Sequence, residues 1–538
     1  MPTIRLPAIK PRTELLLLAG YILAFTLPVI LSSVGQDFVY ASDFYAMIPV
    51  YSFAADFIRS HWSIPVWNPY TGTGMPVIGD PLSGVLNPFL MIPVILFGTA
   101  IGLRLVLAEV ILLSGFAMWQ LLKGMRITGW PRVWGSMLYA SSGVVVGRIA
   151  SGQLEQIFAF PTIPILILAA IQIRLSARQI AAASAALAFM LYAGAVYHVW
   201  HGLIIFGAAR FYVFLTEPRE RGRTAASFLL VIGGFIALGS VKLYDFMIRT
   251  LPLFVRTIPD SRLGSLHFPF SLIPFLVPWR VSFYQREPFI SFFNFHYFWH
   301  EYFAYISPFP FLLAGACIPL LRKRTVRIML FLIFVAVLYI ANGYPYSPFY
   351  WLAELVPQVM VFRTPMRMYM PLTVLVVAFL GVCARRIFSP GMPRKIKSGA
   401  AGIMLLSLIS VMPVAYNTFR RSFEPANSEY REVARELRSR DGGDYYVATL
   451  MCCIQGYMVE EGIPVINYYY GWTPKGSALL SMPDGTSINR EELERTRPKY
   501  VVTLSTMKDM SAYRYGLFFR RGTTIVWKTE DVQYTPYD

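Results

Sequence analysis

The residue best placed to accept a proton is Asp43. It follows Ser42 and stands between an apolar stretch at residues 14–34 and an aromatic, amphipathic stretch at residues 44–58. A carboxylate held at the rim of a bilayer and beside water can take a proton from a hydroxyl group. The same position suits a carboxylate that caps the N-terminus of a helix, so a catalytic and a structural interpretation of Asp43 are both open.

Two arginines, Arg363 and Arg367, surround a predicted helix start. Pro365 fits the first position of a helix, and Thr364 fits its N-cap. A helix N-terminus with two guanidinium groups around it favours a phosphate group. The alternative is a pair of arginines that extend to lipid head groups. We predict the phosphate site, because outer loops rarely carry Arg at the ends of membrane spans.

Three further carboxylates are secondary candidates. Glu155 and Glu301 lie at predicted membrane edges, where ionisable groups are often functional. Asp80 could be a second acidic group of the same outer loop as Asp43. It stands in the turn Gly79-Asp80-Pro81, however, and turns favour aspartate for their own geometry.

His198 and His201 complete the set of secondary candidates. Their i, i+3 spacing is compatible with metal ligation from one face of a helix. This spacing makes a divalent cation a candidate cofactor. Such pairs are common by chance, however, and no third ligand accompanies them in the sequence, so we assign no metal ligand.

The composition shows what kind of element must position these residues. The chain has 538 residues, of which 56% are hydrophobic and 14% charged, and its mean hydropathy is +0.51. These values are typical of a membrane protein and exclude a soluble globular protein of this size.

The net charge of +18 does not indicate nucleic acid. From residue 417 onward 16 basic residues meet 16 acidic ones, whereas residues 1–416 hold 32 basic and 14 acidic residues. The excess therefore belongs to the apolar part of the chain, where it reports topology.

We predict eleven transmembrane helices, because stretches of about 20 apolar residues recur along residues 1–416. They lie at 14–34, 104–123, 133–148, 157–173, 179–195, 199–215, 225–243, 303–321, 325–341, 368–384 and 398–416. Lys and Arg mark every second connection, which places the N-terminus inside and the C-terminus outside a cytoplasmic membrane. The apolar piece at 87–103, interrupted by Gly98 and Gly102, is predicted to be re-entrant or interfacial.

Two domains follow from this pattern. Residues 1–416 form the transmembrane domain, with a large first outer loop at 35–103, and residues 417–538 form a soluble α/β domain on the outer face. In the latter we predict helices at 428–438 and 490–495 and strands at 445–450, 499–504 and 524–528.

Several short motifs together resemble one family of membrane enzymes. They are residues 42–44, 65–70, 72–76, 80–84, 152–156, 301–305, 362–367 and 497–503. In this order they are similar to the YfhO-type branch of the GT-C membrane glycosyltransferases. The block in the first outer loop is the most specific of them.

The resemblance implies a polyprenyl-phosphate sugar donor and transfer of the sugar, outside the cytoplasmic membrane, to a glycan, lipid or protein acceptor. It also implies an acidic base in the first outer loop, at Asp43. Many GT-C enzymes carry paired acidic residues there, whereas Asp43 stands alone with Asp37 six residues earlier. We expect an inverting transfer in which Arg363 and Arg367 hold the lipid phosphate. The alternatives are a transporter or flippase of a lipid-linked or polar substrate, and a non-catalytic assembly factor.

Overall fold

The structure is a computed structural model that falls into two units. It describes residues 10–31, 42–71, 74–255, 270–278, 299–340, 351, 355, 362, 364–422, 428–442, 445–449, 454–466, 473–474, 493–494, 496–504, 510 and 515–529. Unit 1 comprises Met1–Ser32, Arg104–Ser240 and Asp260–Ser422. Unit 2 comprises Ser33–Leu103, Val241–Pro259 and Phe423–Asp538.

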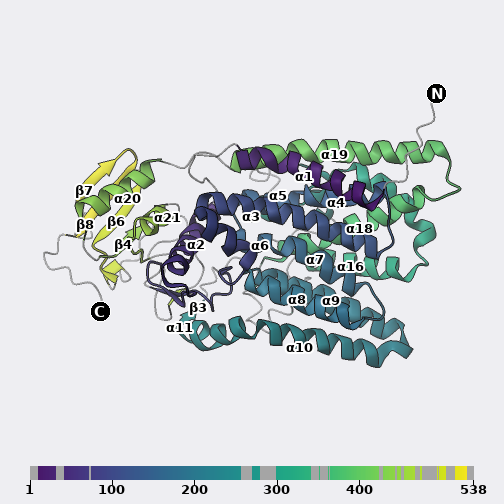
Figure 1. Cartoon of the computed structure of the whole chain (residues 1–538), viewed down its shortest axis with the longest axis horizontal. Helices are drawn as coiled ribbons and strands as arrows, with labels where there is room; N and C mark the ends of the chain where they lie inside the picture. Colours follow the sequence, from purple (N-terminus) through teal and green to yellow (C-terminus); the bar gives the residue numbers. More distant parts are fainter. Residues whose placement is uncertain are drawn as a thin grey trace. The chain divides into compact units, whose positions relative to one another are not determined.

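Unit 1 is a bundle of helices (Figure 1). Its α-helices are α1 (Pro11–Leu31), the end of α3 (Pro88–Gly124), α4 (Trp130–Ala140), α5 (Gly143–Ala150), α6 (Leu154–Ile157), α7 (Ala159–Ala170), α8 (Ala177–Tyr192), α9 (Val196–Thr216), most of α10 (Arg221–Asp245), α12 (Ile273–Leu276), α15 (Trp299–Tyr302), α16 (Arg324–Ile340), α18 (Tyr369–Ile387) and α19 (Arg394–Ser422). The 3-10 helices are η1 (Pro218–Glu220), η3 (Phe270–Leu272), η4 (Phe309–Leu320) and η6 (Pro365–Met368).

Five helices among the described residues are long and apolar enough to cross a membrane. They are Ile101–Gly124, Val196–Thr216, Pro218–Leu253, Pro365–Ile387 and Arg394–Thr418, and each covers one of the predicted spans. In Pro365–Ile387, 89% of the apolar stretch is buried inside the protein, against 28% in Arg394–Thr418. The helix α18 is therefore central in unit 1, whereas most of the apolar stretch of α19 is not buried by the protein.

Two predicted spans differ from the structure. The predicted span 133–148 is divided into α4 and α5, and Ser141 and Ser142 lie between them. The predicted span 303–321 has no helix before Phe309 and continues as the 3-10 helix η4. Prolines explain the second difference, because Pro308, Pro310 and Pro319 lack the N–H that an α-helix needs.

The helix α3 contains the predicted interruption of the apolar piece at 87–103. The backbone at Gly98 is non-helical, with φ 76° and ψ 167°, a conformation that glycine adopts more easily than any other residue. The break separates the apolar helix Pro88–Thr99 from the span-length helix Ile101–Gly124.

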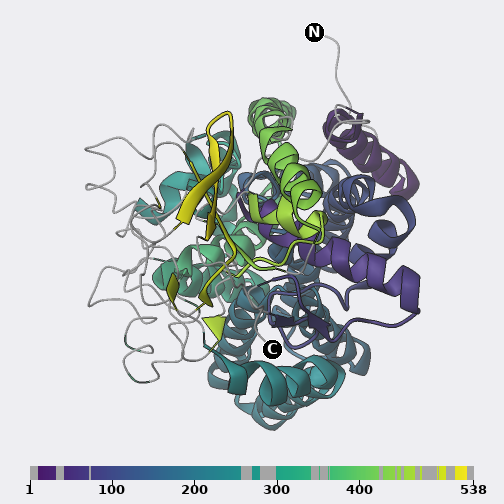
Figure 2. The same ribbon diagram turned by 90° about the vertical axis from the view of Figure 1, so that its left-hand side faces the viewer.

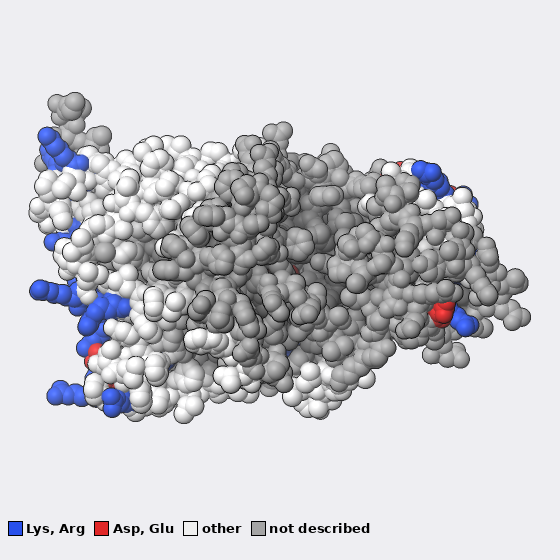
Figure 3. Space-filling view, turned by 180° about the vertical axis from the view of Figure 1, so that it is seen from behind, with Lys and Arg blue, Asp and Glu red and all other residues white. Residues whose placement is uncertain are grey.

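Basic side chains gather at one end of the helical unit on the face shown in Figure 3. The connections that supply exposed Lys and Arg are the ones that the sequence marks as basic: Arg174 and Arg178; Arg219, Arg221 and Arg223; Arg322, Lys323 and Arg324; Arg385 and Arg386; Arg394 and Lys395. This grouping is typical of the side of a membrane protein that retains positive charge.

Unit 2 contains a four-stranded sheet in the order β4-β6-β8-β7. The strand β4 (Val447–Thr449) is parallel to β6 (Tyr500–Leu504), while β8 (Thr524–Thr529) is antiparallel to both β6 and β7 (Tyr515–Arg521). Strands β4, β6 and β8 overlap the predicted strands, and β7 was not predicted. Figure 2 shows the β7-β8 hairpin beside α20 (Ser428–Arg440).

The core of unit 2 lies between its sheet and two helices. Val433 and Leu437 of α20 and Met458 of α21 (Ile454–Glu460) are fully buried against Val502 of β6 and Val526 of β8. The helix α20 confirms the one predicted at 428–438, whereas most of the one predicted at 490–495 lies outside the described residues.

The segment predicted to be the first outer loop belongs to the same unit as the sheet. Its elements are α2 (Ser42–His61), β1 (Trp67–Asn68), β2 (Met75–Pro76) and the start of α3. The helix α2 packs on α21, and Val465 donates a backbone hydrogen bond of 3.0 Å to the carbonyl of Tyr70. The remaining elements of unit 2 are the π-helix η2 (Phe246–Thr250), α11 (Leu251–Leu253), β3 (Phe254–Val255) and β5 (Thr473–Pro474).

Candidate functional site

A tight turn after α5 brings the first polar residues of the site into place. Gly152 has a φ of +74°, which favours glycine, and its N–H bonds to the carbonyl of Ile149 at 3.0 Å. The N–H of Gln153 bonds to the carbonyl of Arg148 at 3.1 Å. These two bonds form a Schellman C-cap. The turn folds Gln153 back over Arg148, whose Nη1 donates to Gln153 Oε1 at 2.7 Å.

Two glycines let the segment with Glu301 approach α5. A Cβ atom on Gly143 would lie 2.5 Å from the backbone nitrogen of Tyr305, and a Cβ on Gly147 would lie 2.8 Å from the ring of Phe303. The backbone N–H of Gly143 also donates to the carbonyl of Tyr305 at 2.8 Å. This close packing of backbones places Glu301, at the start of that segment, within reach of Arg148.

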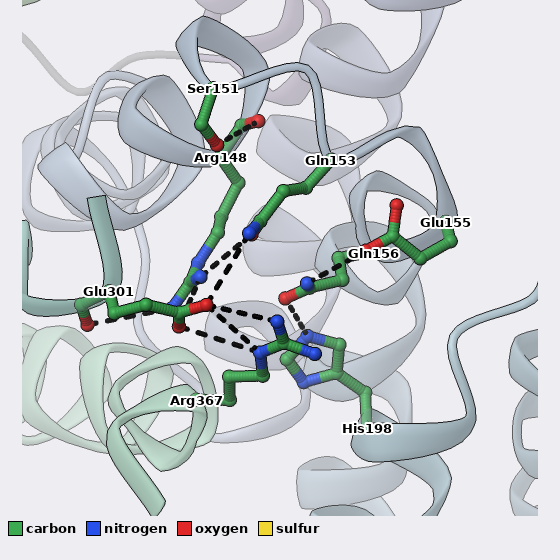
Figure 4. A network of polar contacts seen from close by, with 8 residues as sticks. All are labelled: Arg148, Ser151, Gln153, Glu155, Gln156, His198, Glu301 and Arg367. Carbon is green, nitrogen blue, oxygen red and sulfur yellow. Dashed lines mark hydrogen bonds and ion pairs between the residues drawn. The ribbon is translucent and has the colours of Figure 1, made fainter. Parts of the chain in front are cut away.

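Glu301 is the centre of a buried polar network (Figure 4). Its Oε2 forms an ion pair with Arg148 Nη1, and its Oε1 accepts from Gln153 Nε2 at 3.3 Å. Arg367 donates to Oε1 from Nη2 at 3.0 Å and from Nε at 3.1 Å. One carboxylate therefore joins two guanidinium groups from elements that are far apart in the sequence.

Arg367 is held by its helix start and by an aromatic ring. The predicted start is confirmed, because η6 begins at Pro365, and Thr364 precedes it as the N-cap residue. The backbone N–H of Arg367 bonds to the carbonyl of Thr364 at 3.1 Å. Its guanidinium carbon lies 3.9 Å from the centre of the Tyr197 ring on α9, a cation–π contact.

A second chain of contacts leads from Glu155 to the two histidines. Gln156 Nε2 donates to Glu155 Oε1 at 3.0 Å, and Gln156 Oε1 lies 3.2 Å from His198 Nε2. The ring of His201 contacts that of His198, with 5.8 Å between the ring centres. Burial raises the pKa of the Glu155 carboxyl, although the nearby Arg367 guanidinium and the hydrogen bond from Gln156 oppose this shift.

Several atoms of this chain have no partner among the described residues. They are Glu155 Oε2, His198 Nδ1 and both ring nitrogens of His201. The exposed fractions are 6% for Glu155 and 0% for each histidine. Unpaired polar atoms in the interior are rare, and each needs a functional or structural explanation.

The buried pair of Glu14 and Arg132 in the same unit shows what a purely structural ion pair looks like here. Besides its ion pair with Arg132, Glu14 accepts 2.9 Å hydrogen bonds from Trp119 Nε1 and from the backbone N–H of Gly129. Both carboxylate oxygens therefore have partners. In the chain of contacts from Glu155 to His201, by contrast, several polar atoms have no partner among the described residues. We therefore regard this chain, together with the Glu301 network, as the candidate functional site.

Asp80 belongs to unit 2, where it interacts with a lysine that the sequence did not single out. Lys242, near the end of α10, is 1% exposed, and its Nζ donates to the carbonyl of Ser83 at 2.5 Å. Asp80 is 4% exposed and interacts electrostatically with Lys242. Its Oδ1 accepts from the backbone N–H of Leu82 at 2.9 Å, in agreement with a turn aspartate.

The remaining predicted site residues are only partly described. Asp43 lies in the first turn of α2, in unit 2, and its side chain lies outside the described residues, as does Arg363. In the part of the chain that the structure describes, no three His, Cys, Asp or Glu side chains form a group that could hold a metal ion. A divalent cation remains a candidate cofactor without an assigned site.

The structure thus brings together Glu155, His198, His201, Glu301 and Arg367 of the predicted residues. The sequence did not single out Arg148, which is 3% exposed, although an arginine in the apolar run Gly143–Ala150 is a signal for a functional or paired charge.

Known proteins resemble this chain in fold and not in sequence. No family model and no curated protein matches the sequence. Arabinofuranosyltransferase AftD from mycobacteria has a similar structure, with a TM-score of 0.55 and 14% identity over 98% of this chain. The match covers 40% of AftD, so this chain spans two fifths of that protein.

Two further structures resemble the chain. Oligosaccharyltransferase AglB from Archaeoglobus fulgidus, in complex with an inhibitory peptide and a dolichol-phosphate, has a TM-score of 0.53 and 12% identity over 92% of this chain and 69% of AglB. ArnT from Cupriavidus metallidurans, bound to undecaprenyl phosphate, has a TM-score of 0.53 and 11% identity over 98% of this chain and 100% of ArnT. The chain therefore has the GT-C fold of membrane glycosyltransferases.

Proposed function

We propose that the protein is a membrane glycosyltransferase that moves a sugar from a polyprenyl-phosphate donor to a glycan, lipid or protein acceptor. The transfer takes place on the outer side of a cytoplasmic membrane that the chain crosses eleven times, with the N-terminus inside. Residues 417–538 lie outside as an α/β domain. The YfhO-type branch of the GT-C enzymes is the family to which we assign it.

The charge balance of the buried network carries this proposal. Arg148 and Arg367 share the single carboxylate of Glu301, and burial disfavours the ionised form of Glu155. Two guanidinium groups beside one charged carboxylate leave a net positive charge, which favours an anion. A lipid phosphate supplies such an anion, and the neighbours AglB and ArnT were solved with dolichol-phosphate and undecaprenyl phosphate respectively.

In the proposed reaction the acceptor oxygen attacks the anomeric carbon of the donor sugar. The bond from that carbon to the phosphate oxygen breaks, configuration inverts, and the polyprenyl phosphate leaves with the bonding electrons. Asp43 takes the proton of the acceptor hydroxyl. Arg363 and Arg367 stabilise the departing phosphate, and Glu301 keeps the Arg367 guanidinium in position.

The experiment is incubation of the membrane-reconstituted protein with a panel of polyprenyl-phosphate sugars, followed by detection of free polyprenyl phosphate. Asp43→Asn is expected to lower the release by about 100-fold or more, the usual contribution of a general base. Asp56→Asn is the matched control, because Asp56 lies on the same helix and pairs with Arg59 on the surface. A folded Asp43→Asn protein that transfers sugar as well as wild type would overturn the role of Asp43.

A further inference from the structure

Four polar atoms of Glu155, His198 and His201 have no hydrogen-bond partner among the described residues. Glu155 Oε2, His198 Nδ1 and both nitrogens of His201 belong to side chains that are more than nine-tenths buried. All lie on α6 and α9, and Glu155 and His198 lie next to the network of Glu301 in Figure 4. Their hydrogen-bonding character determines what ligand they can take.

The contacts of Gln156 determine which ring nitrogen of His198 donates a hydrogen bond and which accepts one. Its amide N–H donates to Glu155, so its amide oxygen faces His198 Nε2 and accepts from it. His198 Nδ1 is then an acceptor in a neutral ring. The side chain of His198 lies beside the Arg367 guanidinium in Figure 4, and a second positive charge there is unfavourable.

His201 adds one donor and one acceptor, because a neutral imidazole carries a single N–H. Glu155 Oε2 adds an acceptor when the carboxyl is ionised and a donor when it is protonated. In either case the unpaired set contains at least two acceptors and at least one donor.

This combination of unpaired donors and acceptors favours some classes of ligand over others. A phosphodiester only accepts hydrogen bonds and leaves the acceptors unpaired. A metal ion or an ammonium group does not match the N–H donor and is repelled by Arg148 and Arg367. A hydroxyl group both donates and accepts, so a neutral group with several hydroxyls satisfies the whole set.

We propose that Glu155, His198 and His201 form a subsite for the hydroxyl groups of a sugar, next to Arg367, which we assign to the phosphate. The inference rests on the proposed function, of which it names the sugar-binding side chains. The sugar belongs either to the lipid donor or to the acceptor, and the two sources have the same hydroxyl chemistry.

The test measures binding of polyprenyl-phosphate sugars, of bare polyprenyl phosphate and of a panel of soluble oligosaccharides to the reconstituted protein. The variants are Glu155→Gln and His201→Phe. The glutamine keeps an oxygen for the hydrogen bond from Gln156, and the phenylalanine keeps the ring contacts with His198 and Tyr339. Thr162→Val is the matched control, because the buried Thr162 hydroxyl bonds, among the described residues, to the carbonyls of Phe158 and Ala159.

Wild type and Thr162→Val are expected to bind one sugar-bearing lipid about ten-fold more tightly than bare polyprenyl phosphate, a difference that corresponds to one or two neutral hydrogen bonds. Both subsite variants are expected to lose this preference and to keep their affinity for bare polyprenyl phosphate. That result identifies the donor's sugar as the ligand. If the variants instead lose affinity only for an oligosaccharide, the ligand is the acceptor's sugar.

Variants that bind every probe as wild type does would show that water alone satisfies these atoms and would overturn the subsite. Equal loss of all probes, with a lowered unfolding temperature, would overturn it in favour of a structural role. Failure of wild type to bind any polyprenyl-phosphate lipid counts against the proposed function, and the oligosaccharide measurements then decide the subsite separately.

Discussion

Glu301 and Arg367 are 66 positions apart in the sequence, and their side chains meet in the interior of unit 1 with Arg367 Nη2 3.0 Å from Glu301 Oε1. The side chains are 0% and 9% exposed, respectively. A guanidinium in this position is fixed by two donors to the same carboxylate, so its direction is set before any ligand binds. Glu301 is therefore a positioning residue for Arg367.

Glu301→Gln should strongly destabilise the protein. The variant leaves Arg148 and Arg367 buried without a negative partner, and breaking a buried ion pair in this way costs about 3–5 kcal/mol of the free energy of unfolding. Thermal unfolding in lipid nanodiscs measures the loss. Glu461→Gln, which removes a partly exposed ion pair with Arg435, should cost less than about 1 kcal/mol. Equal unfolding temperatures for the two variants would contradict this view of Glu301.

Lys242→Met should destabilise the segment that contains Asp80 and Ser83. Methionine is similar in length but cannot donate to the carbonyl of Ser83 or compensate the charge of Asp80. We expect faster proteolysis within residues 74–87 and a loss of about 3 kcal/mol in the free energy of unfolding, as for other broken buried pairs.

The double variant Lys242→Met with Asp80→Asn distinguishes the interaction between the two side chains from the packing of each one. Its cost should be smaller than the sum of the two single costs, because each single change already removes the interaction. Lys323→Met, at an exposed position, is the control. Strictly additive costs would mean that Lys242 and Asp80 act independently.

The sequence predicts the long helices well because their signal is local. Apolar runs of about 20 residues predict the five span-length helices, and Thr364 with Pro365 predicts where the helical segment of α18 begins. The strand β7 was not predicted, because its arginines at 520 and 521 and its glycine at 516 weaken the strand pattern. The division between α4 and α5 was not predicted either, because the two residues between them, Ser141 and Ser142, are not strong helix breakers such as proline.

The partners within the site could not be predicted in the same way. Glu155, Glu301 and Arg367 were singled out separately, but their proximity depends on the tight packing of Gly143 and Gly147 against Tyr305 and Phe303. Such contacts are long-range and leave no periodic pattern. Arg148 and Lys242 were missed because a single charge near a span end is usually expected to reach the membrane surface.

The stability of the protein should depend on the protonation of Glu155. Burial raises the pKa of this carboxyl above its ordinary value of 4.5. A raised pKa in the folded state contributes stability that is complete below the ordinary pKa and is lost as pH rises through the folded value. Glu155→Gln resembles the protonated form, so its unfolding temperature relative to wild type should rise as the pH is raised above the ordinary pKa of 4.5.

Glu436 provides a control in which the pKa of the carboxyl is shifted in the opposite direction. Burial tends to raise the pKa of its carboxyl, but hydrogen bonds from Arg521 and Arg440 outweigh burial and lower it. Its contribution to stability is present above the ordinary pKa and is lost as pH falls. Glu436→Gln should therefore become less stable relative to wild type as pH rises. A flat difference for Glu155→Gln over the same range would show that its carboxyl is not held neutral.

Gly522→Ala should destabilise the sheet of unit 2. Gly522 has a φ of +54°, a conformation that costs a non-glycine residue about 1–2 kcal/mol, and an added Cβ would collide with the Glu429 carboxylate. That carboxylate accepts backbone hydrogen bonds from Thr523 at 2.9 Å and from Thr524 at 2.8 Å, which join α20 to the β7-β8 hairpin. Hydrogen exchange of the full-length protein should become at least ten-fold faster in β8, which corresponds to about 1.4 kcal/mol.

The matched control is Gly442→Ala, at a glycine just after α20 that has open space around it and no positive φ. Its exchange in β8 should stay close to that of wild type, because surface changes usually alter stability by less than about 0.5 kcal/mol. Glu429→Ala should accelerate exchange in the same peptides as Gly522→Ala, since both remove the link between the helix and the hairpin. If Gly522→Ala exchanged like Gly442→Ala, the contact between Glu429 and the hairpin would contribute little to the stability of unit 2.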